Sequence, residues 1–386
     1  MSPEIRTPSW WRRPRLAIDT MRILLISGSM PPMKCGVGDY TAKLATALDR
    51  RDDTSVAVVT DAAANPVPSD FTFEVFPIAD GWRMADVSRI AKMARGWCPD
   101  LIHIQYPTQG YGQSYLPWLL PTLFSLMNVP IVQTWHEFHM ERARRNLLNA
   151  VLGGGLIAVR PNYRETMPNW YRWLIRRKRF DFIPSASAIP RIELSEGERL
   201  AIRSEFAPAP SRVIVNFGFA YSSKRIEQLF EIADPSHDHL VLICDLNPDN
   251  EYHRVILDRV NQEPWLGKVT ITGFLPADRV GRILAAADAV VLPFRDGGGI
   301  WNTSIHAAMT QGTFVLTTSR ELQGYHVAAN IYYAQPDDIA DMRTALLTYG
   351  GRSRNETDED PASEWEAIAD AHRAFYASVF KGSQSR

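Results

Sequence analysis

The sequence of 386 residues has only three cysteines, Cys35, Cys98 and Cys244, which stand far apart and form no CxxC pair. This pattern predicts neither a disulfide framework nor a zinc site and is typical of the reducing cytoplasm. No run of about 18 apolar residues is present, so no segment is expected to span a bilayer. The formal net charge of -1 excludes a strongly basic field for nucleic acid.

The first twenty residues carry a cluster of tryptophan and arginine, Trp10–Arg15 (WWRRPR), but no apolar stretch of the kind found in signal peptides. Because the first strand is predicted to begin near Met21, residues 1–20 are interpreted as an N-terminal extension. Two interpretations stay open for it, a disordered tail or a contact with lipid headgroups.

Strand-like and helix-like runs alternate along the chain, which is 45% apolar and 22% charged and long enough for two domains. In the first half, apolar runs predict strands at Arg22–Ser27 (RILLIS), Leu101–Tyr106 (LIHIQY) and Pro130–Trp135 (PIVQTW). A helix is predicted at Asp39–Asp49 and another at Ala85–Trp97. Continuous apolar strands are typical of a parallel sheet that is covered on both faces.

The pattern lapses at Pro184–Pro208 and then restarts. Strands are predicted at Val213–Phe217, Leu240–Asp245, Val269–Thr272, Ala289–Pro293 and Thr313–Thr317. We therefore predict an α/β fold with two Rossmann-like, doubly wound domains that face a central cleft. The domains are expected at residues 21–195 and 205–362, followed by an amphipathic helix at residues 363–380.

Three loops follow predicted strands and carry candidate ligand-binding residues. The first contains Gly36, Val37 and Gly38, where the backbone can approach a ligand at the start of a helix. Tight-turn geometry is an equal explanation for this pair of glycines, and the GxGxxG fingerprint is not met.

The second loop contains His136 and Glu137, directly after a strand of the buried type. The histidine is a candidate to donate a hydrogen bond to a sugar hydroxyl or a leaving group. His103, in the middle of a strand, is interpreted as a core histidine with satisfied hydrogen bonds. His139 adds a third possible metal ligand, but no second cluster completes a site, so no metal is predicted.

The third loop has three successive glycines, Gly297, Gly298 and Gly299, followed by Asn302, Thr303 and Ser304. The polar residues are good N-cap candidates, and a helix start offers backbone N–H groups to an anion. A helix cap needs one of these residues and no glycine triplet, whereas a cradle for a diphosphate needs both. We therefore predict a diphosphate site here.

Together these segments resemble glycosyltransferase family 4, over essentially Arg22 to Phe380. The resemblance also rests on Val213–Lys224 (VIVNFGFAYSSK), Val269–Phe274 (VTITGF), Ala287–Pro293 (ADAVVLP) and Ala307–Gly312 (AAMTQG), in this order. It implies a GT-B fold and transfer of a sugar from a nucleotide sugar, a UDP- or GDP-sugar, with retention of configuration. It further implies that no metal or other cofactor is needed, and that the last helix returns to the first domain.

The resemblance also implies roles for individual residues. Lys224 matches the lysine at the donor diphosphate, where its charge would stabilise the leaving nucleotide. Gly273 and Phe274 match the turn at the base, and His136 matches the histidine near the transferred sugar. Gly36 and Gly38 match the loop that approaches the donor.

Two departures from the family pattern concern the donor site. Phe219 stands after Gly218, where the family has an arginine. Gly299 and Ala307 stand where the family has two glutamates, which hold the sugar and the ribose. Asp296 is the nearest carboxylate that can replace the first, and His306 is the candidate to reach the ribose.

The segment Asn169–Phe180 (NWYRWLIRRKRF) interleaves aromatic rings with basic residues. This composition favours contact with an anionic membrane that carries a lipid-linked glycan acceptor. The candidate contact residues are Trp170, Trp173, Arg176, Arg177, Lys178 and Arg179. A solvated helix face is the alternative, and nucleic acid is not expected because no RNA-binding module is present.

The resemblance therefore implies a retaining, metal-independent hexosyltransferase of polysaccharide or glycoconjugate biosynthesis. It is expected in the cytoplasm at the inner face of the membrane, with a nucleotide sugar and a lipid-linked glycan as partners. Two alternatives stay open: a non-catalytic GT-B partner protein and a GT-B sugar-nucleotide epimerase. An epimerase needs carboxylate acid/base pairs, and the loss of both family glutamates argues against it.

Overall fold

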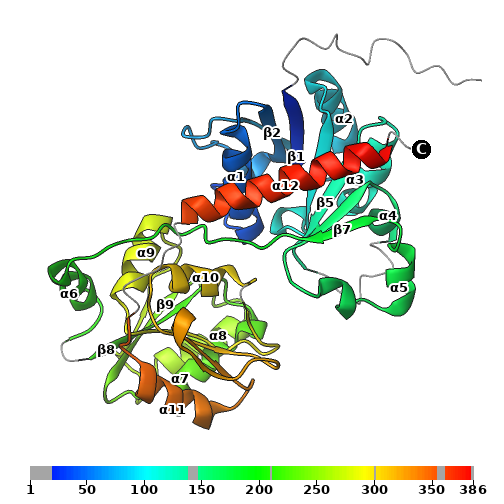
Figure 1. The fold of residues 1–386 in the computed structure, drawn as a ribbon. Coiled ribbons are helices and arrows are strands. Elements are labelled where there is room, and N and C mark those ends of the chain that lie inside the picture. The colour runs from blue at the N-terminus through cyan, green and yellow to red at the C-terminus, as the bar shows by residue number, and fades with distance from the viewer. Residues whose placement is uncertain (1–19, 138–146, 209–210, 300, 354–360, 384–386) are drawn as a thin grey trace, which may run out of the picture. The chain divides into compact units, whose positions relative to one another are not determined.

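The computed structural model describes residues 20–137, 147–208, 211–299, 301–353 and 361–383. The Trp10–Arg15 cluster of the predicted extension and the possible ligand His139 lie outside these ranges. The chain divides into two compact units (Figure 1). Unit 1 comprises residues up to 158, residues 162–182 and residues from 369 on, and unit 2 comprises residues 159–161 and 183–368.

Unit 1 contains a parallel sheet of seven strands in the order β3-β2-β1-β4-β5-β6-β7. The strands are β1 (Met21–Ile26), β2 (Thr54–Asp61), β3 (Glu74–Ala79), β4 (Leu101–Tyr106), β5 (Ile131–Trp135), β6 (Gly155–Ala158) and β7 (Arg179–Phe182). The helices that follow them are α1 (Gly36–Asp49), α2 (Asp86–Trp97), α3 (Leu116–Ser125), α4 (Leu147–Val151) and α5 (Asn169–Leu174).

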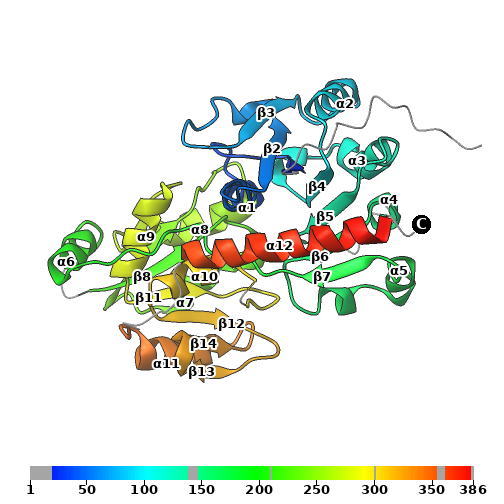
Figure 2. The same ribbon diagram turned by 45° about the horizontal axis from the view of Figure 1, so that its top comes forward.

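Unit 2 also contains a sheet of seven strands, in the order β10-β9-β8-β11-β12-β14-β13. The part from β8 through β11, β12 and β14 to β13 can be followed in Figure 2. The strands are β8 (Arg212–Phe217), β9 (Asp238–Ile243), β10 (Val269–Ile271), β11 (Ala289–Leu292), β12 (Val315–Thr318), β13 (Gly324–His326) and β14 (Ile331–Ala334), and only the β13–β14 pair is antiparallel. The helices are α6 (Glu196–Ser204), α7 (Leu229–Ile232), α8 (Glu251–Val260), α9 (Ala277–Ala286), α10 (Thr303–Thr310) and α11 (Ile339–Tyr349).

Strand side chains in unit 2 alternate between two apolar cores, one on each face of the sheet. Val213 and Val215 belong to one core, and Ile214 between them belongs to the other. Val241 and Leu242 separate in the same way. Because both faces are buried, both faces select mainly apolar side chains, and the few buried polar ones, such as Asn216 and Thr317, are hydrogen-bonded. The predicted α/β class is confirmed.

The last helix, α12 (Pro361–Ser383), contributes to both units, since the division falls between Ile368 and Ala369. In unit 2, the Trp365 indole donates a hydrogen bond of 2.8 Å to the Ser187 carbonyl. In unit 1, His372 and Tyr376 are fully buried. Unit 1 gives way to unit 2 after Phe182, earlier than the predicted domain end at residue 195, because β7 is the last strand of the first sheet.

Candidate active site

In each sheet the strand order reverses at a central strand. The central strand β1 has β2 on one side and β4 on the other, and β8 likewise lies between β9 and β11. The loops after the two strands of such a switch point leave in opposite directions and open a crevice at the carboxyl ends. All predicted donor residues of unit 2 follow β8, β10 or β11, so they lie at the end of the sheet where the carboxyl ends of these strands meet.

The loop after β8 carries Gly218 and Lys224 and packs against the loop after β11. Gly218 has φ +126, and a Cβ atom there would lie 3.0 Å from Ser304 Oγ at the start of α10. The Lys224 Nζ atom lies 4.1 Å from the centroid of the Phe294 ring, a cation–π contact. A hydrogen bond of 2.9 Å from the Arg295 N–H to the Ser223 carbonyl joins the two loops.

The glycine triplet has structural explanations that the sequence did not reveal. Gly297 has φ +84, and Cβ atoms at Gly298 and Gly299 would lie 2.3 Å from the rings of Phe294 and Trp301, respectively. The three N–H groups already donate within the protein, to Phe294 O, Thr318 O and Asn302 Oδ1. The N–H groups of the three glycines are therefore occupied by internal hydrogen bonds, and the diphosphate site at this loop stays a prediction.

The N–H groups available to a ligand lie instead at the start of α10. The Asn302 side chain occupies the N-cap position but accepts from Gly299, so it does not cap the helix. Within the described part of the chain, no acceptor contacts the N–H groups of Thr303 or Ser304. Together with the helix dipole, these two groups favour an anion.

The remaining predicted residues of unit 2 follow β10 and β11 and differ in exposure and in their contacts. Asp296 is exposed and pairs with Arg295 at 3.3 Å and with Arg320 at 3.9 Å. Gly273 has φ +71, and the Phe274 N–H donates to Asp245 Oδ1 at 2.9 Å, while its ring is 51% exposed.

An aromatic pair takes the place of the family arginine. The Phe219 ring stacks on Tyr221, with 6.1 Å between centroids and an interplanar angle of 27°. The half-buried Phe219 therefore contributes an apolar wall to this loop, not a positive charge.

In unit 1, Gly36, Val37 and Gly38 form the first turn of α1, whereas the sequence predicted a loop with the helix starting at Asp39. Cys35 precedes them in an extended conformation and provides no side-chain cap. A Cβ atom at Gly38 would lie 3.1 Å from the Ser29 carbonyl oxygen, whereas one at Gly36 meets nothing within 4 Å. Gly38 is thus needed for packing, and space is open beside Gly36.

His136 follows β5 and is half-buried against the Tyr40 ring, at a centroid distance of 4.8 Å. Its Nε2–H donates to Gln105 Oε1 at 2.9 Å, and its backbone N–H donates to the Tyr106 carbonyl. Burial lowers the pKa of His136 to about 3; Glu137 opposes this shift and His372 adds to it. The imidazole is therefore neutral at physiological pH, and Glu137 beside it is exposed.

His103 is a fully buried core histidine, as predicted. Its Nδ1 lies 2.7 Å from the Tyr376 hydroxyl of α12, and its Nε2 lies 2.8 Å from Thr134 Oγ1. Burial, together with His372 and His136, lowers the pKa of His103 well below its usual value. The ring is therefore held neutral.

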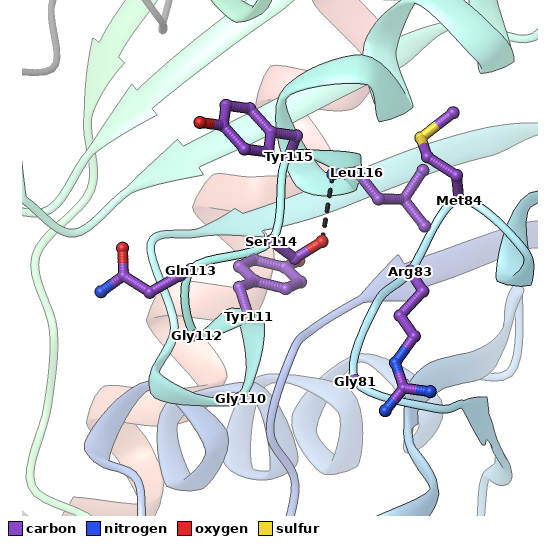
Figure 3. A pocket seen from close by; sticks show the side chains of 10 residues that line it. All are labelled: Gly81, Arg83, Met84, Gly110, Tyr111, Gly112, Gln113, Ser114, Tyr115 and Leu116. Carbon is purple, nitrogen blue, oxygen red and sulfur yellow. Dashed lines mark hydrogen bonds between the residues drawn. The ribbon is translucent and has the colours of Figure 1, made fainter.

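A pocket of about 390 Å³ lies between the loops that follow β3 and β4 in unit 1 (Figure 3). Arg83 and Met84 line it from one loop, and Tyr115 lines it from the other, next to Leu116 at the start of α3. The Leu116 N–H donates to Ser114 Oγ, which shapes the second loop. Sequence reasoning missed this pocket. The available signal was the glycine- and tyrosine-rich stretch that begins at Gly110, directly after a buried strand.

The basic aromatic segment forms α5, a turn and the edge strand β7. Trp170 and Trp173 are 47% and 60% exposed, and the Arg176 guanidinium lies 3.9 Å from the Trp173 ring centroid. Arg177 and Arg179 are also exposed.

Lys178 does not belong to that surface. Its ammonium donates to the carbonyls of Leu152, at 2.5 Å, and Gly153, at 2.7 Å. Burial lowers the pKa of Lys178 to about 7. The prediction of a surface cation at Lys178 is wrong, because this side chain holds the turn after α4.

Two further properties concern metals and membranes. Across the described ranges, no group of three or more His, Cys, Asp or Glu residues is placed to hold a metal ion. None of the described helices is long and apolar enough to cross a membrane.

Comparison with known proteins identifies the architecture. Residues 35–215 match the model of the Glycosyl transferase 4-like domain. Sucrose-phosphate synthase from Thermosynechococcus elongatus is similar in structure, with a TM-score of 0.70 at 16% identity over 94% of this chain and 100% of that chain. HepE from Anabaena, in complex with UDP-glucose, has a TM-score of 0.64 at 16% identity over 95% of this chain and 100% of its own.

A putative UDP-N-acetylglucosamine 2-epimerase from Listeria monocytogenes is also similar, with a TM-score of 0.58 at 13% identity over 94% of this chain and 97% of that chain. No curated protein matches the sequence. At such low identities the structural likeness shows the fold, and the predicted GT-B fold is confirmed.

Proposed function

We propose that this chain, which has the GT-B fold and carries a glycosyl transferase 4-like domain, is a retaining glycosyltransferase that uses a nucleotide sugar. The observation that carries the proposal is the convergence of Lys224, Gly218 and the start of α10 at the switch point of unit 2. A cation, a glycine with positive φ and two N–H groups at a helix start suit a nucleoside diphosphate.

In this reaction the bond between the anomeric carbon and the donor phosphate oxygen breaks, and the nucleoside diphosphate leaves with the electron pair. The acceptor hydroxyl oxygen bonds to the anomeric carbon, and its proton passes to the leaving diphosphate oxygen. Lys224 and the N–H groups of Thr303 and Ser304 stabilise the charge that develops on the diphosphate. UDP- and GDP-sugars are the donors we propose, and Phe274 is proposed to contact the base.

In unit 1 we propose that His136 and Glu137 lie at the transferred sugar, and that Gly36, with open space beside it, lets the donor approach α1. In unit 2 we propose that Asp296 holds sugar hydroxyls. The pocket between Arg83 and Tyr115 offers the acceptor an exposed aromatic ring and a positive charge. Hexosyl transfer without a metal or other cofactor completes the proposal.

We further propose a lipid-linked glycan acceptor and a place in the cytoplasm at the inner face of the membrane. The exposed Trp170 and Trp173, with Arg176, Arg177 and Arg179, support it, since tryptophan and arginine together favour an anionic headgroup layer. The pathway we propose is polysaccharide or glycoconjugate biosynthesis.

The membrane contact is tested by sedimentation with anionic vesicles at low and moderate salt. Arg176→Gln with Arg177→Gln removes two charges, each worth about 1 kcal/mol near an anionic surface, so the bound fraction should fall strongly. The matched control, Lys92→Gln with Arg95→Gln in α2, removes two charges from the same unit and should pellet like the wild type. Equal pelleting of all three proteins would exclude this surface as the contact.

The donor site is tested by calorimetric titration with UDP, GDP and ADP, followed by assays of transfer from the matching nucleotide sugars. Lys224→Ala should lower turnover, because about 3–4 kcal/mol of transition-state stabilisation is lost, and it should leave the fold intact. Lys268→Ala is the control, because Lys268 precedes β10 and so lies at the opposite edge of the same sheet. Wild-type rates in Lys224→Ala would remove this lysine from the mechanism.

The same titration separates the competing functions. A non-catalytic partner protein would bind none of the nucleotides. An epimerase would bind UDP and convert a UDP-sugar without any acceptor, which product analysis detects. The exposed, arginine-paired Asp296 favours transfer over epimerisation, since acid/base catalysis by carboxylates depends on burial or like-charge pairing.

A further inference from the structure

Gln105 lies in the middle of a chain of buried side chains that ends at His136. Gln105 is fully buried on β4, and His136 directly follows the neighbouring strand β5. Its amide oxygen lies 2.9 Å from His136 Nε2, and its amide nitrogen lies 3.3 Å from His103 Nε2. The amide therefore connects the two imidazole rings.

The orientation of this amide decides which ring nitrogen of His136 carries the proton. A carbonyl oxygen only accepts, so His136 Nε2 must be the donor, and in a neutral imidazole Nδ1 is then a bare acceptor. The other end is consistent: the amide N–H and the Thr134 hydroxyl both donate to His103 Nε2, and His103 Nδ1–H donates to Tyr376. No partner for His136 Nδ1 is found among the described residues, and the ring is only half-buried.

We infer that Gln105 fixes His136 as the Nε2–H tautomer, so that its Nδ1 accepts a hydrogen bond from a hydroxyl group of the bound sugar. The inference rests on the proposed function, in which His136 meets the transferred sugar. It reverses the expected role of this ring, from donor to acceptor. Gln105 is a positioning residue, because it acts through His136.

The surroundings of His136 keep the ring neutral. Tyr40 from α1 covers it edge-on, and His372 from α12 and Glu137 beside it are the titratable groups that act on it. Burial outweighs Glu137, so the ring stays neutral across the physiological range and one nitrogen keeps its lone pair. A neutral, tautomer-fixed imidazole selects a donor partner, and a sugar hydroxyl is one.

The experiment is nitrogen NMR of the full chain with labelled histidine, in which the ring nitrogens of His136 are identified by their loss in His136→Ala. We expect protonated Nε2 and bare Nδ1 in the wild type. Gln105→Leu should give a mixture of tautomers, and kcat/KM should fall roughly tenfold, the value of one neutral hydrogen bond.

Gln133→Leu is the matched control, because Gln133 is a buried glutamine on β5 whose amide oxygen accepts from Trp135, not from His136. It should keep the wild-type tautomer. Gln105→Glu places a carboxylate on His136 Nε2, which raises its pKa, so activity should fall with acidification at a higher pH than in the wild type.

A protonated Nδ1 in the wild type, or an unchanged spectrum in Gln105→Leu, overturns the inference. If Gln105→Leu does not fold, the wild-type spectrum and the pH profile of Gln105→Glu decide. Calorimetric titration with UDP, GDP and ADP on the same samples separates the two failures: absent nucleotide binding rejects the proposed function, whereas the tautomer is read independently of activity.

Discussion

Acidification should destabilise unit 1 through His103. The ring is fully buried and neutral, so the folded state takes up no proton there, whereas the unfolded chain binds one below its ordinary pKa of about 6.5. Because the pKa of His103 is lower in the folded state than in the unfolded state, its contribution to stability is present above the unfolded pKa. This contribution is lost as the pH falls toward the folded pKa. Because His103 binds its proton only in the unfolded chain, lowering the pH from 7 to 5 should lower the free energy of unfolding by about 2 kcal/mol through this one histidine.

The assay compares the wild type with His103→Gln at pH 7, 6 and 5. The substitution lowers stability at every pH, because a buried hydrogen-bonded ring is lost, but it removes one titrating group. The stability difference between the two proteins should therefore shrink by about 2 kcal/mol between pH 7 and pH 5. Hydrogen exchange of peptides that cover Leu101–Tyr106 measures this stability difference within unit 1. A difference independent of pH would refute the reasoning.

Four further outcomes are expected. Burial raises the pKa of Asp39 from 3.8 to about 6, despite Lys43, so ionisation of this carboxyl group opposes folding as pH rises. Asp39→Asn should therefore raise the free energy of unfolding by about 3 kcal/mol at pH 8 and by little at pH 4, as measured by urea denaturation. Gly38→Ala should cost about 1–3 kcal/mol in thermal unfolding, whereas Gly36→Ala should be nearly neutral. Lys178→Gln should lower the melting temperature, because two carbonyls of the turn lose their donor, and an unchanged value would contradict the structural role. Chelator should leave transfer activity intact; loss in EDTA that is restored by manganese or magnesium would reject the metal-free proposal.

The strongly apolar strands were predictable from the sequence. Leu101–Tyr106 is β4 with the same bounds, because a strand that is buried on both faces is mostly apolar, here interrupted by His103 and Gln105. The strands β6, β7, β13 and β14 were missed. They are only three or four residues long, and β7 (RFDF) lies at the sheet edge, where exposed polar side chains are tolerated.

The candidate site was predictable in position but not in detail. Strand ends placed Gly218, Lys224 and His136 at the carboxyl edges of their sheets, since parallel strands share that edge. The packing of Gly298 and Gly299 against the rings of Phe294 and Trp301 depends on three-dimensional contacts, and local sequence gives no sign of it. The contact of Gln105 with His136 was hidden for the same reason, because His136 follows a neighbouring strand and is distant in the sequence.

The division of helix α12 bears on the order in which the protein is completed during synthesis. His372 and Tyr376 fill the interior of unit 1, although they are translated after every residue of unit 2. A nascent chain that has only reached Phe182 lacks the Tyr376 hydroxyl that pairs with His103. The unit that begins first on the ribosome is therefore finished last, and it must wait with part of its interior unfilled while all of unit 2 emerges.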